Sequence, residues 1–322
     1  MNKKSLLNTS VQLVEITENQ TGQRLDNFLV KILKKLPRSR LYRIIRKGEV
    51  RVNKKRVKPE YKLCAGDLLR IPPLKLEAAD DDPVEISAGL LQHLEQAILF
   101  ENDAIIVLNK PSGLAVHSGS GLRFGVIDAF RKLRHETDIE LVHRLDRDTS
   151  GCLLLAKNRP ALLTMQKQLQ TNQIRKTYAA ITRGHWNQSV GQIDLPLLRQ
   201  TMPNGERKVF VDDNGQTALT LIDEARHFSI DDLRFSQLTI RLMTGRTHQI
   251  RVHCQSQHHE IAGDQKYGDR KFNKDFKKLA GKRLMLHAQK LEIPESDHTK
   301  ALSIHAPLPE EFMKLHQDNK NG

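Results

Sequence analysis

The chain has 322 residues, which exceeds the usual size of one domain and makes two domains the default expectation. Its longest apolar runs, such as 104–108, are far shorter than the roughly 20 residues of a membrane helix, and its first ten residues lack an extended apolar segment, which together predict a cytoplasmic protein with no membrane partner. Three scattered cysteines exclude a disulfide framework, and a net charge of +14 favours an anionic partner.

The positive charge is concentrated in one short segment. Residues 24–70 contain 16 Lys or Arg and 4 Asp or Glu, a net charge of +12, so the rest of the chain carries 14 − 12 = +2. Such a cluster is typical of modules that bind nucleic acid, because each neutralised phosphate releases counterions. The alternative is a solvated basic face that has no partner.

This basic segment predicts two helices followed by a small curled sheet. Apolar residues recur at helical spacing over 25–36, Pro37 ends this helix, and the spacing resumes over 38–47 before Gly48. Alternating valines and a further hairpin over 61–72 follow. The second helix and the turn beyond it carry the candidate RNA-binding residues Arg38, Arg40, Arg43, Arg46, Lys47, Lys54, Lys55 and Arg56.

Three stretches occur in this segment in a fixed order, namely RLDNFL, SRLYRIIRKGEVRVNKKRV and LCAGDLLRIP. In this order they resemble the small αL RNA-binding module that a small-subunit ribosomal protein shares with several RNA-modifying enzymes. The resemblance covers residues 23–72 and implies that this part of the chain binds RNA.

The composition changes abruptly after the basic segment. Residues 73–89 are acidic and contain few large apolar side chains, which predicts a linker. We therefore expect an N-terminal tail over 1–20, the RNA-binding module over 21–72, the linker, a larger domain over 90–315 and a C-terminal tail over 316–322.

The larger domain alternates strand and helix patterns, so its predicted class is α+β, with a central, mostly antiparallel or mixed sheet flanked by helices. Residues 202–215 predict an exposed hairpin or loop, and Thr247 is placed to cap a helix. The predicted helices are 126–133 and 160–169, and the predicted strands are 97–100, 104–109, 152–156, 176–182, 218–222, 238–243 and 283–293.

The stretch HRLDRDTSG, residues 143–151, places a carboxylate at the mouth of a turn, where chemistry is often found. If residues 140–146 form a strand, Arg144 and Asp146 share one face because side chains alternate along a strand. Residues 152–156 then return as a buried strand. The alternative interpretation is a hairpin whose arginine and aspartate form a surface ion pair.

Six motifs follow the RNA-binding module in this domain, in the chain order KPSGLAVH, HRLDRDTSG, KTY, GRTHQIRVH, GDQKYGD and RLMLHA. Together they resemble the pseudouridine synthases related to the enzymes that modify large-subunit ribosomal RNA, over residues 97–310. The resemblance implies that the chain isomerises uridines in 23S ribosomal RNA, acts as a monomer and needs no cofactor or metal. Its partner is expected to be either the 23S RNA itself or a large-subunit assembly intermediate.

The family's site residues transfer to this sequence one position at a time. The resemblance implies that Asp146 is the catalytic carboxylate and that Arg144 fills the gap left by an extruded base. It further implies that Tyr178 stacks on the target uracil, that Arg246 pairs with the aspartate and that Leu286 lies under the uracil.

Other interpretations have weaker support in the sequence. The histidines and cysteine between His248 and His259 could suggest zinc, but they lack the usual ligand spacings. Asp146 and Asp148 could suggest a glycosidase pair, and HRLD a kinase loop, but two carboxylates this close need not flank one sugar, and no nucleotide-binding loop is present. The remaining alternative is a non-catalytic RNA-binding or ribosome assembly factor.

Overall fold

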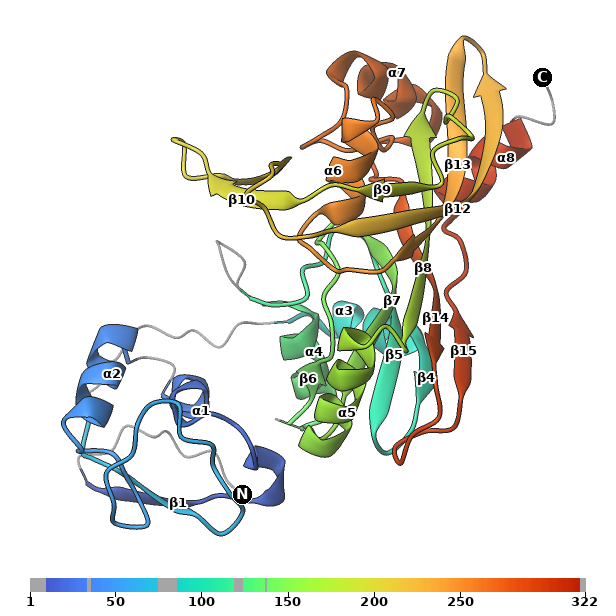
Figure 1. Ribbon diagram of the computed structural model, residues 1–322. Coiled ribbons are helices and arrows are strands. Elements are labelled where there is room, and N and C mark those ends of the chain that lie inside the picture. The colour runs from blue at the N-terminus through green and yellow to red at the C-terminus, as the bar shows by residue number, and fades with distance from the viewer. Residues whose placement is uncertain (1–9, 34–35, 75–85, 119–123, 137, 319–322) are drawn as a thin grey trace. The chain divides into compact units, whose positions relative to one another are not determined.

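The computed structural model describes residues 10–33, 36–74, 86–118, 124–136 and 138–318 (Figure 1). The chain forms two compact units, one made by residues up to Glu85 and the other by nearly all of the chain from Ile86 onward. Each unit has its own apolar core. No helix of the described part of the chain is long and apolar enough to cross a membrane.

The first unit contains the predicted helix pair. Helices α1 (Leu25–Ile32) and α2 (Arg38–Arg46) bury the apolar side chains that the spacing placed inward. The first helix is shorter than predicted because it ends at Ile32, although Leu33 and Leu36 beyond it are still buried in the core. Gly48 has a φ of +71°, the left-handed backbone that favours glycine after a helix.

A three-stranded antiparallel sheet completes this unit, in the order β1-β3-β2. Its strands are β1 (Gln12–Glu15), β2 (Arg51–Val52) and β3 (Leu68–Ile71). A 3-10 turn, Glu18–Gln20, follows β1. Strand β1 lies within the segment 1–20 that we expected to be a tail, because it pairs with β3. The sequence contains no periodic signal long enough to reveal so short an edge strand.

The segment 61–72 forms one strand rather than the predicted hairpin. Its first half pairs instead with the segment before α1, through an isolated antiparallel bridge between Arg24 and Lys62. The buried carboxylate of Asp67 holds the turn that follows. Asp67 accepts hydrogen bonds from Asn53 Nδ2 at 2.7 Å, from the Tyr61 hydroxyl at 3.0 Å and from the backbone N–H of Cys64 at 2.9 Å. Most of the predicted linker, residues 75–85, lies outside the described residues.

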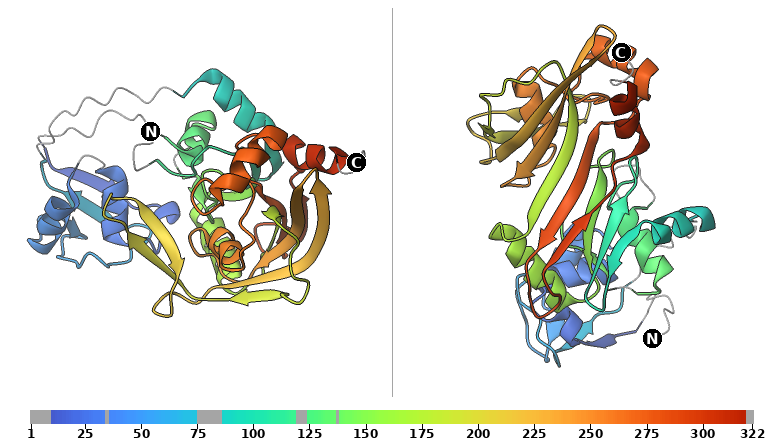
Figure 2. Two further views of the ribbon diagram at one scale, coloured as in Figure 1. Left: turned by 90° about the horizontal axis from the view of Figure 1, so that it is seen from above. Right: turned by 90° about the vertical axis from the view of Figure 1, so that its right-hand side faces the viewer.

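The second unit is built on a ten-stranded mixed sheet whose main path runs β4-β5-β7-β14-β8-β13-β12-β9 (Figures 1 and 2). Among the described residues, every strand pairing of this sheet is antiparallel except that of β7 with β14, which is parallel. The predicted mixed, mostly antiparallel sheet is therefore confirmed. Its strands are β4 (Ile98–Glu101), β5 (Ile105–Lys110), β6 (Glu140–Leu141), β7 (Ser150–Ala156), β8 (Arg175–Arg183), β9 (Gln192–Asp194), β12 (Leu219–Ile230), β13 (Leu233–Leu242), β14 (Leu286–Ile293) and β15 (Leu302–His305).

Helices cover the sheet, and β7 shows why both of its faces are buried. Leu153 and Leu155 pack into one core cluster and Leu154 into another, because side chains alternate across a strand. Phe130 of α4 joins the first cluster and Met165 of α5 the second. The helices are α3 (Ala88–Gln96), α4 (Val126–Leu133), α5 (Arg159–Gln170), α6 (Gln249–Ser256), α7 (Arg270–Ala280) and α8 (Glu310–Asp318).

Residues 202–215 belong to a hairpin, as predicted. Strands β10 (Leu197–Thr201) and β11 (Arg207–Val211) pair only with each other and form a two-stranded sheet outside the main one. This hairpin is visible as the yellow arm in Figure 1.

The parallel pairing of β7 with β14 depends on a close backbone approach at Gly151. This residue has a φ of +105°, and a Cβ placed there would lie 2.2 Å from the carbonyl oxygen of Ala288. A side chain at this position would strain the backbone and push the two strands apart.

We therefore expect Gly151→Ala to lower the free energy of unfolding by about 2 kcal/mol or more, through strain and steric overlap. The matched control is Gly89→Ala in helix α3, where nothing lies within 4 Å of the added Cβ. That substitution should stabilise the protein by about 0.5–1 kcal/mol because alanine favours helices. Thermal or urea unfolding measures both variants, and a neutral Gly151→Ala would contradict this account of the strand contact.

Candidate active site

The segment between β6 and β7 is a loop rather than the predicted strand. Only Glu140 and Leu141 pair with β7, and residues 142–149 leave the sheet. Within this loop Leu145 is buried in the core, while Arg144 is exposed and Asp146 half-buried. Arg144 and Asp146 line the same pocket, but so do His143 and Leu145, so the alternation of faces expected of a strand does not describe this loop.

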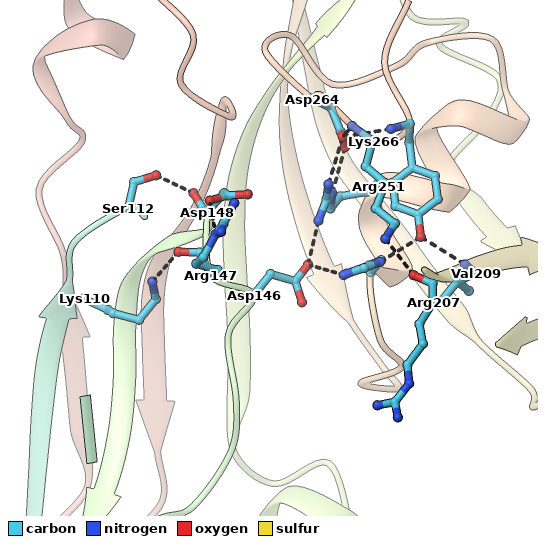
Figure 3. Close-up of polar contacts among 12 residues, drawn as sticks. Lys110, Ser112, Asp146, Arg147, Asp148, Arg207, Val209, Arg251, Asp264 and Lys266 are labelled. Atoms are coloured by element: carbon cyan, nitrogen blue, oxygen red, sulfur yellow. Dashed lines mark hydrogen bonds and ion pairs between the residues drawn. The ribbon is translucent and has the colours of Figure 1, made fainter. Parts of the chain in front are cut away.

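The loop is held from behind by the KPSGLAVH segment. The Lys110 ammonium is fully buried and donates hydrogen bonds to the carbonyls of Pro111, Leu114 and Arg147 at 2.8, 2.8 and 2.9 Å. The hydroxyl of Ser112 donates to the carbonyl of Asp148 at 2.6 Å (Figure 3). These contacts fix the two residues that follow Asp146, so they restrain the direction of its carboxylate.

Arg251 is the cation beside Asp146. Its Nη1 lies 3.4 Å from Asp146 Oδ2, and its Nε and Nη2 donate to the two carboxylate oxygens of Asp264 at 2.7 and 2.8 Å (Figure 3). Burial is nearly complete here, with exposed side-chain fractions of 7% for Arg251 and 1% for Asp264. One guanidinium is thus shared by two carboxylates.

Electrostatics keep this group charged. Burial alone would raise the pKa of Asp264, but the hydrogen bonds and charge of Arg251 outweigh it and hold that pKa below its usual value. Burial would likewise lower the pKa of Arg251, yet the two carboxylates raise it above its ordinary value. The arginine therefore stays protonated and places a positive charge beside Asp146.

The predicted pairing of Asp146 with Arg246 is wrong. Arg246 is exposed on the turn before α6 and donates through Nε to the carbonyl of Thr217 at 3.0 Å. Arg251 lies one turn inside α6, on the side that faces Asp264. The motif GRTHQIRVH contains both arginines, and only the path of the distant GDQKYGD turn decides which one is buried. Thr247 is not the cap of α6 either, because His248 occupies that position with a φ of +55°.

His248 is a second group beside Asp146, and the sequence alone suggested it only as a member of a possible zinc cluster. Its Nε2 lies 4.0 Å from Asp146 Oδ2, and its Nδ1 lies 2.7 Å from the hydroxyl of Tyr267. That hydroxyl already accepts the backbone N–H of Val209 on β11, at 3.1 Å. In the tautomer in which Nδ1 accepts the proton of this hydroxyl, the ring proton is on Nε2 and faces Asp146. Burial lowers the pKa of His248, so the ring is neutral at pH 7.

A pocket of about 470 Å³ lies in front of Asp146. Tyr178 on β8 and Leu286 on β14 form part of its wall, and their strands are neighbours in the sheet. Burial, and then the charge of Asp146, raise the pKa of Tyr178, so its hydroxyl keeps its proton. The predicted catalytic residue Asp146 lines this pocket together with all four predicted substrate-binding residues, namely Arg144, Tyr178, Arg246 and Leu286.

A second pocket, of about 840 Å³, shares Asp146 and its neighbours with the first. Its lining includes the basic side chains of Lys266, Lys282 and Arg283. The loop of residues 142–149, which we call the reactive loop, therefore contributes to two concave surfaces, and both contain cations.

The predicted RNA-binding residues of the first unit gather around α2 and the turn after β2. Arg40, Arg43, Arg46 and Lys47 line a shallow concave surface on α2. Of the eight candidates, seven are exposed and Arg40 is half-buried. The helix buries its apolar side and leaves these charges outward.

Comparison with known proteins identifies the family. The RNA pseudouridylate synthase family matches residues 104–256, and the S4 domain family matches residues 23–69. The ribosomal large subunit pseudouridine synthase C of Haemophilus influenzae is 45% identical over 317 residues, 98% of this chain and 97% of that protein. The enzyme of the same name from Escherichia coli K12 is also 45% identical, over 97% of this chain and 98% of that protein.

The chain belongs to the RNA pseudouridylate synthase family. It is therefore an RNA pseudouridine synthase, an isomerase, with an N-terminal S4 domain. Among solved structures, human RNA pseudouridylate synthase domain containing 4 is similar with a TM-score of 0.59 and 27% identity, over 72% of this chain and 96% of that one. The family expectation from the sequence motifs is confirmed.

The guanidinium of Arg251, which Asp146 and Asp264 share, can be tested by substitution in this synthase. We expect Arg251→Gln to lower kcat/KM by about 100-fold or more, because a buried carboxylate would lose its preorganised counter-charge. The matched variant is Arg246→Gln, which should mainly raise KM because Arg246 is exposed at the pocket. Tritium release from RNA containing 5-tritiated uridine measures both, and a larger loss of kcat in Arg246→Gln would restore the pairing expected from the sequence.

His248 generates a second prediction, tested by two amides of different reach. His248→Gln can place a donor near the position of imidazole Nε2, whereas His248→Asn suits the left-handed backbone but reaches only the position of Nδ1. We expect Asn to lower kcat by about tenfold relative to Gln, the effect of one lost hydrogen-bond donor. If both variants had the same kcat, the donor facing Asp146 would be irrelevant to the reaction.

Proposed function

We propose that this synthase isomerises uridines to pseudouridine in large-subunit (23S) ribosomal RNA, in the cytoplasm and as a monomer, with Asp146 as the catalytic carboxylate. The relatives named for this substrate cover 97% or more of this chain, which supports the substrate class. The observation that carries the role of Asp146 is its position between two pockets, beside a buried guanidinium and a neutral imidazole.

The reaction needs one ionised carboxylate and no change of oxidation state. The bond between N1 and C1′ of uridine breaks, the base turns, and C5 bonds to C1′. The proton lost from C5 is balanced by the proton that N1 gains. Asp146 can act as a nucleophile at C1′ or C6, or as a base at the 2′ hydrogen, and each route requires its anion. Arg251 and the Nε2 proton of His248 stabilise that anion.

The pocket walls support the binding of a single extruded base. A target uridine must leave its stack before it can reach Asp146, which costs a few kcal/mol. Tyr178 offers an aromatic face, and Leu286 an apolar surface, inside a pocket of about 470 Å³. Arg144 is exposed beside the reactive loop and lines both pockets, which suits a side chain that enters the vacated stack.

The S4 domain supplies a separate grip on the RNA. Its basic residues on α2 and in the turn of Lys54 and Lys55 face outward, where they can neutralise phosphates. A pocket for a flipped base in the catalytic unit and a phosphate-binding surface on the S4 domain are together what a large structured RNA requires. A free nucleoside would need only the pocket.

We expect Asp146→Asn to abolish tritium release from ribosomal RNA labelled at uridine C5 while keeping RNA affinity within about threefold, because the amide keeps the shape but not the charge. A protein that only bound RNA would show neither the release nor its loss. Mapping pseudouridines in ribosomal RNA from cells that express only Asp146→Asn identifies the sites. Full turnover by this variant would overturn the proposed role.

A further inference from the structure

The outer face of α7 carries a row of cations that the pocket residues do not include. Five side chains of this helix are exposed, at positions spaced by one, three, three and one residues. This spacing follows one face of a helix and spans about 12 Å along its axis. The opposite face is fixed inward, because Phe272 and Phe276 are buried against Phe235 of the sheet. We define the α7 stripe as Arg270, Lys271, Lys274, Lys277 and Lys278.

The charge balance of the catalytic unit depends on this stretch alone. Residues 86–322 contain 33 Lys or Arg and 27 Asp or Glu, a net charge of +6. Residues 270–283 contain 7 Lys or Arg and 1 acidic residue, also a net +6, so the remainder of the unit has 26 of each and is neutral. The positive charge is therefore localised rather than spread over the surface.

The stripe is continuous with the active site. Lys282 and Arg283, which follow α7, line the second pocket beside Asp146. The side chain of Asn273, on α7 itself, accepts the backbone N–H of Gly263 and donates to the carbonyl of Asp264, both at 2.9 Å. Asp264 in turn holds Arg251.

The residues of the stripe are better explained as a binding site for a polyanion than as a basic surface that has no partner. Lysines three and four residues apart on a helix repel one another, and a neighbouring anion removes that repulsion. The helix's one acidic residue, Asp275, pairs with Lys278 at 2.8 Å and cannot neutralise the other four cations. Lysine binds phosphate as a point charge without a fixed geometry, which suits a backbone whose sequence varies.

We propose that the α7 stripe binds the phosphate backbone of the substrate RNA that flanks the target uridine, beside the second pocket. This inference rests on the proposed function, since it requires that the uridine at Asp146 belongs to a longer RNA. The catalytic unit then has its own grip on the strand, independent of the S4 domain. The strand on this side of the reactive loop is held by Lys282, Arg283 and the stripe in succession.

The test compares two double variants of the full-length enzyme. Lys271→Gln with Lys274→Gln removes two charges from the stripe, and Lys167→Gln with Lys300→Gln removes two exposed charges from α5 and from the segment before β15. Affinity for a ribosomal RNA fragment is measured from 50 to about 300 mM salt, and tritium release gives kcat and KM. The stripe variant should lower the log–log salt slope by about 1.4, at 0.7 per single-strand phosphate, and raise KM several-fold with kcat unchanged.

The control variant should keep both slope and KM. Lys271→Arg with Lys274→Arg keeps the charge and should behave as the wild type, which separates charge from folding. Equal salt slopes for the stripe and control variants would overturn the proposal, as would an unchanged KM in the stripe variant. The Asp146→Asn variant tests the proposed function separately, because its turnover does not depend on the stripe.

Discussion

The site depends on one guanidinium shared by two carboxylates. Arg251 binds Asp264 through two short hydrogen bonds and Asp146 through a longer contact of 3.4 Å. Asp264 is almost fully buried and neutralises most of the arginine, while Asp146 keeps 17% of its side chain exposed. The tight pair fixes the position of the cation, and the looser contact leaves Asp146 oxygens accessible to a substrate. A reactive anion needs both, since it must be held ionised and still be reachable.

The surrounding elements act on this arrangement from three directions. Lys110 and Ser112 bind the backbone just beyond Asp146, so the loop cannot swing away from the sheet. Asn273 binds the turn at Asp264, which places Arg251. Tyr267 links His248 to the β10–β11 hairpin through Val209. A hairpin that stands outside the main sheet is thereby connected to the carboxylate by two hydrogen bonds and one 4.0 Å contact.

Charge is divided between the two units of the chain in different forms. The S4 domain carries it on α2 and an adjacent turn, whereas the catalytic unit carries it on α7 and in its pockets. The sequence count already showed the first of these, because +12 falls within residues 24–70. The sequence count concealed the charge of the catalytic unit, because the net charge of the rest of the chain combines the acidic segment near residue 80 with the basic residues of α7. Only burial shows that the α7 cations share one face.

The sequence by itself determined the elements whose evidence is local or periodic. No knowledge of the tertiary structure was needed to recognise the apolar spacing of α4, the buried run of β7 or the family motifs. The motifs assigned Asp146, Tyr178 and Leu286 to one site, and all three line one pocket. Only the tertiary structure decided which arginine serves Asp146, because Arg246 and Arg251 belong to the same motif and differ in what packs against them. It also decided that residues 142–149 form a loop and that His248 faces Asp146. In each case the deciding partner, Lys110, Asp264 or Tyr267, lies far away in the chain, where no local pattern can register it.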